Sequence, residues 1–305
     1  MTGKAVPPLS VVVASGAGGD FLYRCLASLE GQAKLAGAEV IVVDRCGTET
    51  RERIAARYPS VQVIAYPGDD RPSVPEMRAC GVDHSRGAIV AVIEEHCVAR
   101  PDWLETILGA FGPDDDAIGG PILDAEFPRT RDWVVYFSEY HNDLPPWQPE
   151  ARTWINDANA AYSRARLIEN RDGLGDSYWA IALHPRLVDS GASVRAVPEM
   201  GVCHTGPFDY GYYLRQRYLL SRVWGGTQRH RVSVAVRLVH LAAAPIFPLF
   251  LLMRIGRRVH ATGSARLRSK FLRALPLLVP VVVVFTCGEF LGYLLGPGKA
   301  LEEVE

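Results

Sequence analysis

The chain has 305 residues, which is enough for one large domain or two small ones. Hydrophobic residues make up 48% and charged residues 22%, as in ordinary globular proteins, and the formal net charge of -1 gives no general attraction for nucleic acid. The six cysteines show neither a CxxC pair nor zinc-finger spacing, which excludes a structural zinc site of that kind and favours reduced, buried thiols.

The first part of the chain alternates buried strands with helices. Continuous apolar runs predict strands at residues 9–15, 38–44, 61–67 and 88–94, and helical spacing predicts helices at residues 21–32, 48–59, 73–87 and 101–111. This alternation predicts an α/β fold with a mostly parallel sheet and helices on both faces. Ligands of such sheets lie beyond the carboxyl ends of the strands, where Asp44 and the run Glu94–His96 are expected.

The middle of the chain is less regular. Residues 119–154 are predicted to be loop-rich and aromatic. Residues 156–169 and 178–191 are predicted to form helices, the second bent at Pro185, and residues 193–204 a strand that ends at His204.

The C-terminal part has two apolar segments, Val234–Met253 and Ala274–Leu295, each about the ~20 residues that span a bilayer. The strongly basic stretch Arg254–Arg273 lies between them, and basic loops stay on the cytoplasmic side. We therefore expect a kinked re-entrant or interfacial first segment and one true span. Two full spans, or two buried core helices of a soluble protein, stay open. The predicted domains are residues 1–228 and a membrane-associated helical region at 229–305.

Four stretches resemble family 2 glycosyltransferases. "LSVVVAS…FLYRCLASLEGQ…AEVIVVDRCGTETRERI" is similar to the opening of these enzymes, and "MRACGVDHSRGAIVAVIEEHCVARPDWLETILGAF" to their central block with its acidic metal-binding motif. "NDANAAYSRARLI" resembles the acceptor-side segment, and "SGASVRAVPEMGVCH" resembles the strand that closes the core. The resemblance covers roughly residues 8–225 and implies a GT-A fold and inverting sugar transfer.

On the donor side, the resemblance implies that Asp44 binds the base of a nucleotide-diphosphate sugar and that Ser15 lies in the first loop near the nucleotide. Arg78 matches an arginine suited to phosphate, or to an ion pair with Asp44 or Glu94. The helix that follows the core has four further candidates, which either close over the donor or form a basic membrane-surface helix: Gln216, Arg217, Arg222 and Trp224.

Glu94, Glu95 and His96 match the acidic motif, so the resemblance implies a divalent metal, Mn²⁺ or Mg²⁺, and an imidazole ligand favours Mn²⁺. Glu95 is also expected to contact the donor, and His204 is a further candidate metal ligand. The alternatives are a solvated strand end for residues 94–96 and a histidine hydrogen-bonded to backbone at position 204.

At the catalytic base the chain departs from the pattern that the resemblance implies, because Trp179 and Ala180 occupy the positions of the family's usual Glu-Asp pair. An inverting transfer needs a carboxylate to take the proton from the acceptor hydroxyl. The candidates are Asp176, which as an alternative caps a helix, and Asp157.

The favoured function is a metal-assisted, inverting glycosyltransferase on the cytoplasmic face of the cell (inner) membrane. Its expected partners are a nucleotide sugar, membrane lipid and a lipid-linked or glycan acceptor, with no nucleic acid. One alternative is a catalytically silent relative that binds nucleotide sugar or a membrane partner. A nucleotidyltransferase ranks low, because the first loop "SGAGGD" has no lysine or arginine for a triphosphate.

Overall fold

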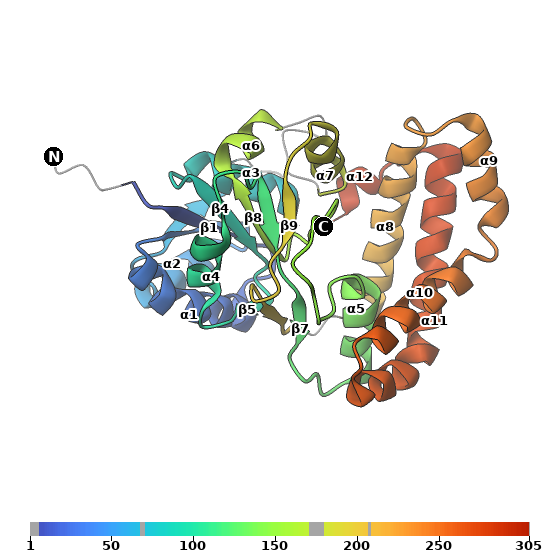
Figure 1. The fold of residues 1–305 in the computed structure, drawn as a ribbon, viewed down its shortest axis with the longest axis horizontal. Coiled ribbons are helices and arrows are strands. Elements are labelled where there is room, and N and C mark those ends of the chain that lie inside the picture. Colours follow the sequence, from blue (N-terminus) through green and yellow to red (C-terminus); the bar gives the residue numbers. More distant parts are fainter. Residues whose placement is uncertain (1–5, 68–70, 171–179, 207–208, 305) are drawn as a thin grey trace. The chain divides into compact units, whose positions relative to one another are not determined.

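The computed structural model describes residues 6–67, 71–170, 180–206 and 209–304 (Figure 1). The chain divides into two compact units, one of Met1–Ala125 with Pro145–Gly206 and one of Glu126–Leu144 with Pro207–Glu305. This division differs from the predicted boundary at residue 228. Residues 126–144 and helix α8 (Tyr210–Gln228) group with the C-terminal helices, because aromatic and glycine-lined faces pack these segments together.

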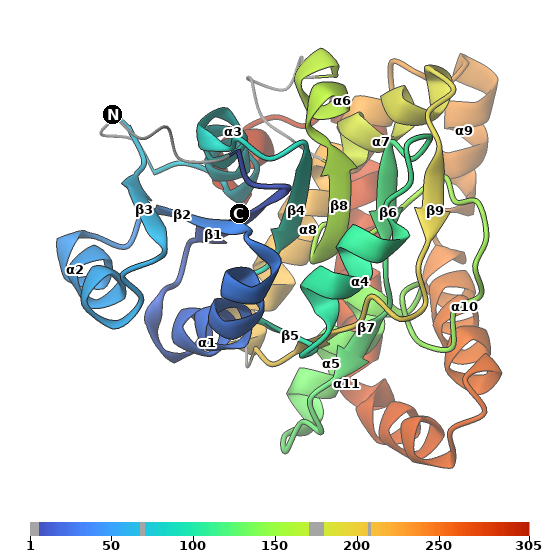
Figure 2. The same ribbon diagram turned by 60° about the vertical axis from the view of Figure 1, so that its left-hand side comes forward.

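Within the described residues, seven strands of the first unit form one sheet in the order β3-β2-β1-β4-β8-β6-β9 (Figure 2). β1 pairs in parallel with both β2 and β4, and β8 runs antiparallel to β4 and β6. The prediction of a mixed, mostly parallel sheet is confirmed. The strands are β1 (Leu9–Ser15), β2 (Glu39–Asp44), β3 (Gln62–Ala65), β4 (Ile89–Ile93), β6 (Ala117–Gly119), β8 (Asn159–Ser163) and β9 (Val194–Ala196).

The helices of this unit are α1 (Gly19–Ala36), α2 (Thr48–Arg57), α3 (Val74–His84), α4 (Trp103–Ala110), α6 (Arg164–Glu169) and α7 (Ala180–Asp189). α3 matters most for the site. It begins at a capping box in which Ser73 and Glu76 satisfy each other's backbone N–H groups. Gly81 then lets α3 pack tightly on β1, since a Cβ there would lie 2.4 Å from Val12. This packing holds Arg78 over the carboxyl end of the sheet.

Two predicted elements were wrong. Residues 156–169 are not one helix, because Asn159–Ser163 form the central strand β8, whose small alanines fit between two neighbouring strands, and only Arg164–Glu169 are helical. Residues 193–204 are not one strand, because the chain turns at Pro198–Gly201. β9 ends at Ala196, and β10 (Val202–His204) joins a second sheet with β5 (Cys97–Ala99) and β7 (Ile122–Asp124).

The second unit is helical, with α5 (Thr130–Tyr140), α8, α9 (Val234–Ala243), α10 (Phe247–Ala261), α11 (Ala265–Leu295) and α12 (Ala300–Glu303). The loop predicted at 119–154 thus contains β7 and α5. α8 and α11 approach at backbone distance through Gly225, Gly288 and Gly292. A Cβ on any of the three would lie 2.4 Å or less from atoms of the facing helix. Small residues at such spacing are typical of helix pairs in membranes.

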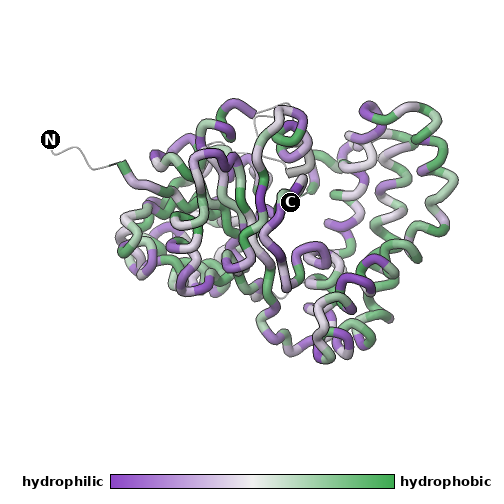
Figure 3. Tube along the Cα trace, in the orientation of Figure 1, coloured by the Kyte–Doolittle hydropathy of each residue, from purple (hydrophilic) through white to green (hydrophobic). Residues whose placement is uncertain are grey.

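Among the described residues, α11 is long and apolar enough to cross a membrane, and a third of its most apolar window is buried in the structure. α9 and α10 pass the same test together, but they are bent by 81° at their junction. This bend agrees with the kink predicted for the first apolar segment, and Pro245 lies between the two helices. Hydrophobic residues predominate along α9 and the first part of α10 (Figure 3). Several of their side chains are exposed, among them Val239, Leu249 and Phe250. A buried core helix does not leave such a surface, so the soluble-core alternative is disfavoured.

Candidate active site

Three strands of the first unit end side by side and bring polar residues to one edge of the sheet. The register of β1 and β2 places Ser15 directly beside Asp44. β4 lies on the other side of β1 and ends at Ile93, so Glu94 follows at the same edge. The structure therefore brings Asp44 and Glu94 to the edge where they were expected, with Ser15 beside them at the end of β1, and their roles stay a prediction.

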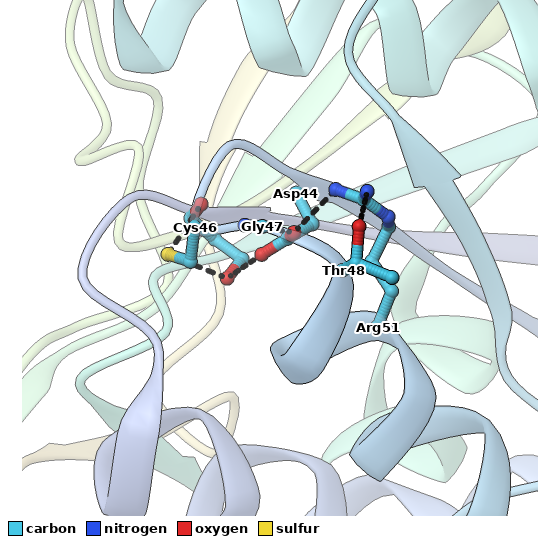
Figure 4. Close-up of polar contacts among 6 residues, drawn as sticks. Asp44, Cys46, Gly47, Thr48 and Arg51 are labelled. Carbon is cyan, nitrogen blue, oxygen red and sulfur yellow. Dashed lines mark hydrogen bonds and ion pairs between the residues drawn. The ribbon is translucent and has the colours of Figure 1, made fainter.

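Asp44 is 1% exposed and is fixed by three hydrogen-bond donors (Figure 4). Ser15 Oγ donates to Oδ1 at 2.9 Å, and Oδ2 accepts from Gly47 N at 3.1 Å and from Arg51 Nη1 at 3.2 Å. A carboxylate has about four acceptor positions, and these three donors occupy three of them, so the orientation of Asp44 is fixed. The sequence signal for the pair between Asp44 and Arg51 is Thr48. This residue opens α2 and accepts a hydrogen bond from the guanidinium group of Arg51.

Arg45, which replaces an acidic residue usual in the family, joins two loops at this edge. Its Nε donates to Gly16 O at 3.4 Å and its Nη1 to Pro72 O at 2.5 Å. The residue therefore links the loop after β1 to the segment before α3. Nothing in the sequence indicated these contacts.

Glu95 lies 4% exposed, with its carboxylate inside the loop that follows β1. Oε1 accepts from Gly16 N at 3.0 Å and from Ala17 N at 2.7 Å, and Oε2 accepts from Gly18 N at 2.9 Å. Burial raises the pKa of Glu95, while His96 and the three N–H groups oppose the shift. Successive N–H groups of this kind form an anion site, which here holds the protein's own carboxylate. Both oxygens of Glu95 thus face the loop, not a donor as predicted.

Replacing Glu95 by glutamine is expected to loosen this loop. The amide places an N–H donor against backbone N–H groups, and loss of a buried hydrogen bond to a charged group costs about 1.5–3 kcal/mol. For a unit of this size we expect the Tm to fall by about 3–10 °C. Differential scanning fluorimetry measures it, with the exposed change Glu49→Gln as control. A Tm equal to that of wild type would show that the three hydrogen bonds contribute nothing.

Arg78 joins two carboxylates at the same edge. Its Nη2 lies 3.6 Å from Glu94 Oε1 and its Nη1 lies 2.7 Å from Asp157 Oδ2. The expected ion pair with Glu94 is present, whereas Asp44 pairs with Arg51 instead. Arg78 is 6% exposed, so this bridge sets the positions of both carboxylates.

Asp157 has a polar chain behind it. Burial raises the pKa of Asp157 to about 6, and the charge of Glu94 adds to the rise, against Arg78 and a hydrogen bond from Tyr162. Tyr162 Oη also lies 3.0 Å from His184 Nε2. Burial lowers the pKa of His184 to about 3, so its ring is neutral. Tyr162 was missed because its segment was predicted to be a helix, and strand periodicity was the signal that could have revealed it.

The candidate metal ligands are only partly brought together. The rings of His96 and His204 stack with centroids 5.9 Å apart, and His204 is fully buried. Burial and His96 lower the pKa of His204 far below its usual value, so it stays neutral. The described part of the chain has no group of three histidine, cysteine or acidic side chains placed to hold a metal. One candidate ligand is accessible, because the side chain of Glu94 is about a quarter exposed. A single carboxylate fits the mode in which substrate phosphates supply the other ligands.

The other predicted residues lie elsewhere. Asp176 and Trp179 are outside the described residues. Gln216, Arg217, Arg222 and Trp224 belong to α8 in the helical unit. There Arg217 pairs with Glu139, Arg222 donates to Gly296 O at 3.4 Å, Trp224 hydrogen-bonds Glu289, and Gln216 is buried. These contacts give α8 a packing role, and the donor role stays a prediction.

The cysteines follow the prediction in part. All six are free thiols, as expected. Cys46 and Cys287 are exposed, however, and Cys46 lies beside Asp44 (Figure 4). Partial burial of the thiol group raises the pKa of Cys46 to about 11, so the thiol is protonated at neutral pH.

Comparisons with known proteins agree with this geometry. A glucosyl-dolichyl phosphate glucuronosyltransferase of Haloferax volcanii is 29% identical over 111 residues, which is 35% of this chain and 33%, about a third, of that relative. The mannosyltransferase PcManGT from Pyrobaculum calidifontis, solved with GDP-Man and Mn²⁺, has a TM-score of 0.57 at 15% identity and covers 95% of this chain and 88% of its own. GalNAc-T7, solved with UDP, GalNAc and Mn²⁺, has a TM-score of 0.51 at 14% identity. The match covers 66% of this chain and 43% of the GalNAc-T7 chain.

The two structural likenesses show the fold, which is the GT-A fold expected from the sequence. The family model described as glycosyl transferase family 2 matches residues 10–171, more than half of the chain and the whole of the edge from Ser15 to Asp157. The chain therefore belongs to glycosyl transferase family 2.

Proposed function

We propose that the protein transfers a sugar, with inversion, from a nucleotide-diphosphate sugar to a lipid-linked or glycan acceptor at a membrane. The bridge from Glu94 through Arg78 to Asp157 carries this proposal, because it puts a leaving-group side and a base side at one edge of the sheet. Family membership supports the reaction class. The nucleotide sugars and Mn²⁺ named for the two structural neighbours support the donor class.

On the donor side, Asp44 accepts a ring N–H of the base. Ser15, Gly47 and Arg51 hold that carboxylate still, so base recognition costs little reorganisation. The loop held by Glu95 forms the neighbouring wall. Which base is bound depends on contacts beyond Asp44, since Arg45 is occupied by backbone carbonyls.

On the acceptor side, Asp157 takes the proton from the attacking hydroxyl. A pKa of about 6 leaves this carboxylate ionised at neutral pH and still basic enough to accept a proton. Arg78 and Tyr162 fix its orientation. Asp157 is our choice of the two predicted bases, because its carboxylate pairs with Arg78 at the edge of the sheet that also holds Glu94, and its pKa is raised to about 6.

The leaving group is a nucleoside diphosphate whose negative charge grows as the glycosidic bond breaks. Glu94, with His96 beside it, would hold a divalent cation together with phosphate oxygens of the donor. Such an ion supplies Lewis-acid neutralisation of the diphosphate. Glu94 keeps its place for this role through Arg78.

The apolar helix α11 supports a membrane-associated acceptor. α11 has the length and hydropathy of a span, and the Haloferax volcanii relative is named for a dolichyl phosphate-linked substrate. We propose that the catalytic unit lies on the cytoplasmic face, because the stretch before the apolar part of α11 is strongly basic.

A silent relative that only binds nucleotide sugar is the second candidate. The Glu-Glu-His motif and the missing Glu-Asp pair favour it. A thermal-shift screen of nucleotide sugars, with and without Mn²⁺, tests the donor class. We expect at least one nucleoside diphosphate sugar to raise the Tm only when Mn²⁺ is present. No shift with any nucleotide would contradict both candidates.

A further inference from the structure

Arg254 and Arg258 form a cationic cluster in the helical unit, and the proposed reaction uses neither residue. Arg254 and Arg258 are one turn apart on α10, exposed on the same face. Arg254 Nη2 donates to Asn142 Oδ1 at 3.0 Å, just beyond the C-terminal end of α5. This contact joins the basic face of α10 to the last residues of α5.

An aromatic contact fixes the same region. The ring of Phe271 on α11 meets Phe137 on α5 edge to face, with centroids 5.6 Å apart. A Cβ on Gly256 of α10 would lie 3.5 Å from the Phe271 ring. The three helices therefore pack around Phe271, and the residues one turn beyond Phe137 lie next to the basic face of α10.

His141, one turn after Phe137, has one nitrogen without a use in the fold. The residue is 8% exposed, and its Nδ1 lies 3.3 Å from Ser138 O. Its Nε2 is buried and has no hydrogen-bond partner among the described residues. Burial, Arg254 and Arg258 lower the pKa of His141 to about 4, so the ring is neutral. With Nδ1–H donating to Ser138, Nε2 offers a buried lone pair, which is costly unless a ligand satisfies it.

The level of the cluster relative to the apolar run of α11 indicates which kind of molecule reaches it. The first turns of α11 carry Arg266, Lys270 and Arg273. The charged groups of Arg266 and Lys270 lie over the ring of Trp133, at 5.5 and 5.3 Å from its centroid. The apolar run begins at Ala274. Phe271 belongs to the basic turns, so the cluster packed around it lies at the level of lipid headgroups if α11 enters a bilayer.

Apolar side chains precede the cluster on α10. Leu249, Phe250 and Met253 are 59%, 53% and 38% exposed, and they lie within about one and a half turns before Arg254. Exposed apolar residues next to two guanidinium groups fit a molecule with a hydrocarbon part and an anionic head. A soluble phosphate compound would leave the apolar residues uncovered.

We propose that Arg254, Arg258 and His141 bind the headgroup of a lipid phosphate monoester. The guanidinium groups pair with the phosphate oxygens by charge-assisted hydrogen bonds. A monoester keeps a P–O–H group in its singly ionised form, and this hydroxyl donates to His141 Nε2. A phosphodiester has no such hydroxyl, so the site selects monoester over diester lipids. The proposal uses membrane attachment for the level of the site, but it does not depend on glycosyl transfer.

The test uses the full chain in an uncharged detergent, so that no surface potential contributes. Short-chain phosphatidic acid, phosphatidylglycerol, phosphatidylcholine and inorganic phosphate are titrated, and the rise in Tm gives an apparent affinity. The variants are Arg254→Gln with Arg258→Gln, Arg258→Gln alone, and His141→Phe. Arg257→Gln is the matched control, because it removes the same charge from the same helix outside the cluster.

We expect phosphatidic acid to bind best, and its affinity to fall at least about tenfold in the double variant and within about twofold of wild type in the control. His141→Phe should abolish the preference for phosphatidic acid over phosphatidylglycerol. Should the double variant unfold, Arg258→Gln, an exposed change, carries the test with a smaller loss. Equal losses in the double variant and Arg257→Gln would show diffuse attraction and overturn the site. Equal Tm shifts with inorganic phosphate and phosphatidic acid would overturn the lipid assignment.

Discussion

Replacing Asp157 by asparagine is expected to lower kcat by about 10²–10⁴-fold, the usual contribution of a positioned general base. Binding of the donor nucleotide should change little, because Asp157 lies on the acceptor side of Arg78 and an asparagine oxygen can still accept from the guanidinium. Steady-state release of nucleoside diphosphate gives kcat, and calorimetric titration gives the binding constant.

Asp116→Asn is the matched control for this change. Asp116 is 16% exposed and pairs with Arg166 at 2.6 Å, against 19% and 2.7 Å for Asp157 and Arg78. Loss of an ion pair alone should therefore affect both variants alike, whereas loss of a base affects Asp157→Asn alone. Equal turnover in the two variants would remove Asp157 from the mechanism and leave Asp176 as the predicted base.

The pH profile provides a second readout of Asp157. Its pKa is raised to about 6, so the carboxylate is ionised above that pH and protonated below it. A protonated carboxyl cannot accept a proton, so wild-type kcat/KM should fall about tenfold for each pH unit below about 6. The residual activity of Asp157→Asn should lack this acid limb.

Replacing Glu94 by glutamine is expected to weaken metal-dependent binding of a nucleoside diphosphate. Loss of a group that merely orients a metal ligand costs about 10–100-fold in metal affinity, and loss of a ligand should cost at least as much. Calorimetric titration with Mn²⁺ present should show this loss. With a chelator present, wild type and variant should bind equally weakly.

Glu39→Gln provides the control, since Glu39 is a largely buried carboxylate paired with Arg86 at the opposite, amino-terminal end of β2. This variant should retain the wild-type response to Mn²⁺. If Glu94→Gln also retains it, Glu94 is not a metal ligand.

The first unit was largely predictable because its signals are local. Continuous apolar runs gave β1, β2 and β4, and each ends near the predicted residue. β8 was missed because alanine favours helices, and only its place between β4 and β6 makes Asn159–Ser163 a strand. The split of residues 193–204 between two sheets also depends on tertiary pairing, although Pro198 and Gly201 were local warnings.

The site was predictable as an edge but not as a set of contacts. Strand ends fix where Asp44 and Glu94 lie, so sequence periodicity reached them. The turn of Glu95 into the loop at Gly16–Gly18 depends on backbone N–H directions, which a sequence does not show. The bridge from Arg78 to Asp157 joins residues 79 positions apart, and packing of α3 on β1 sets it.

Turnover, with the anomeric configuration of the product, tests the central claim most directly. The full chain is incubated with Mn²⁺, a nucleotide sugar that binds, and a membrane-lipid extract, and the transferred sugar is analysed by nuclear magnetic resonance. We predict a product whose anomeric configuration is opposite to that of the donor, formed about 10²–10⁴-fold more slowly by Asp157→Asn. A donor that binds but is never transferred, or a product that retains its configuration, would contradict the account.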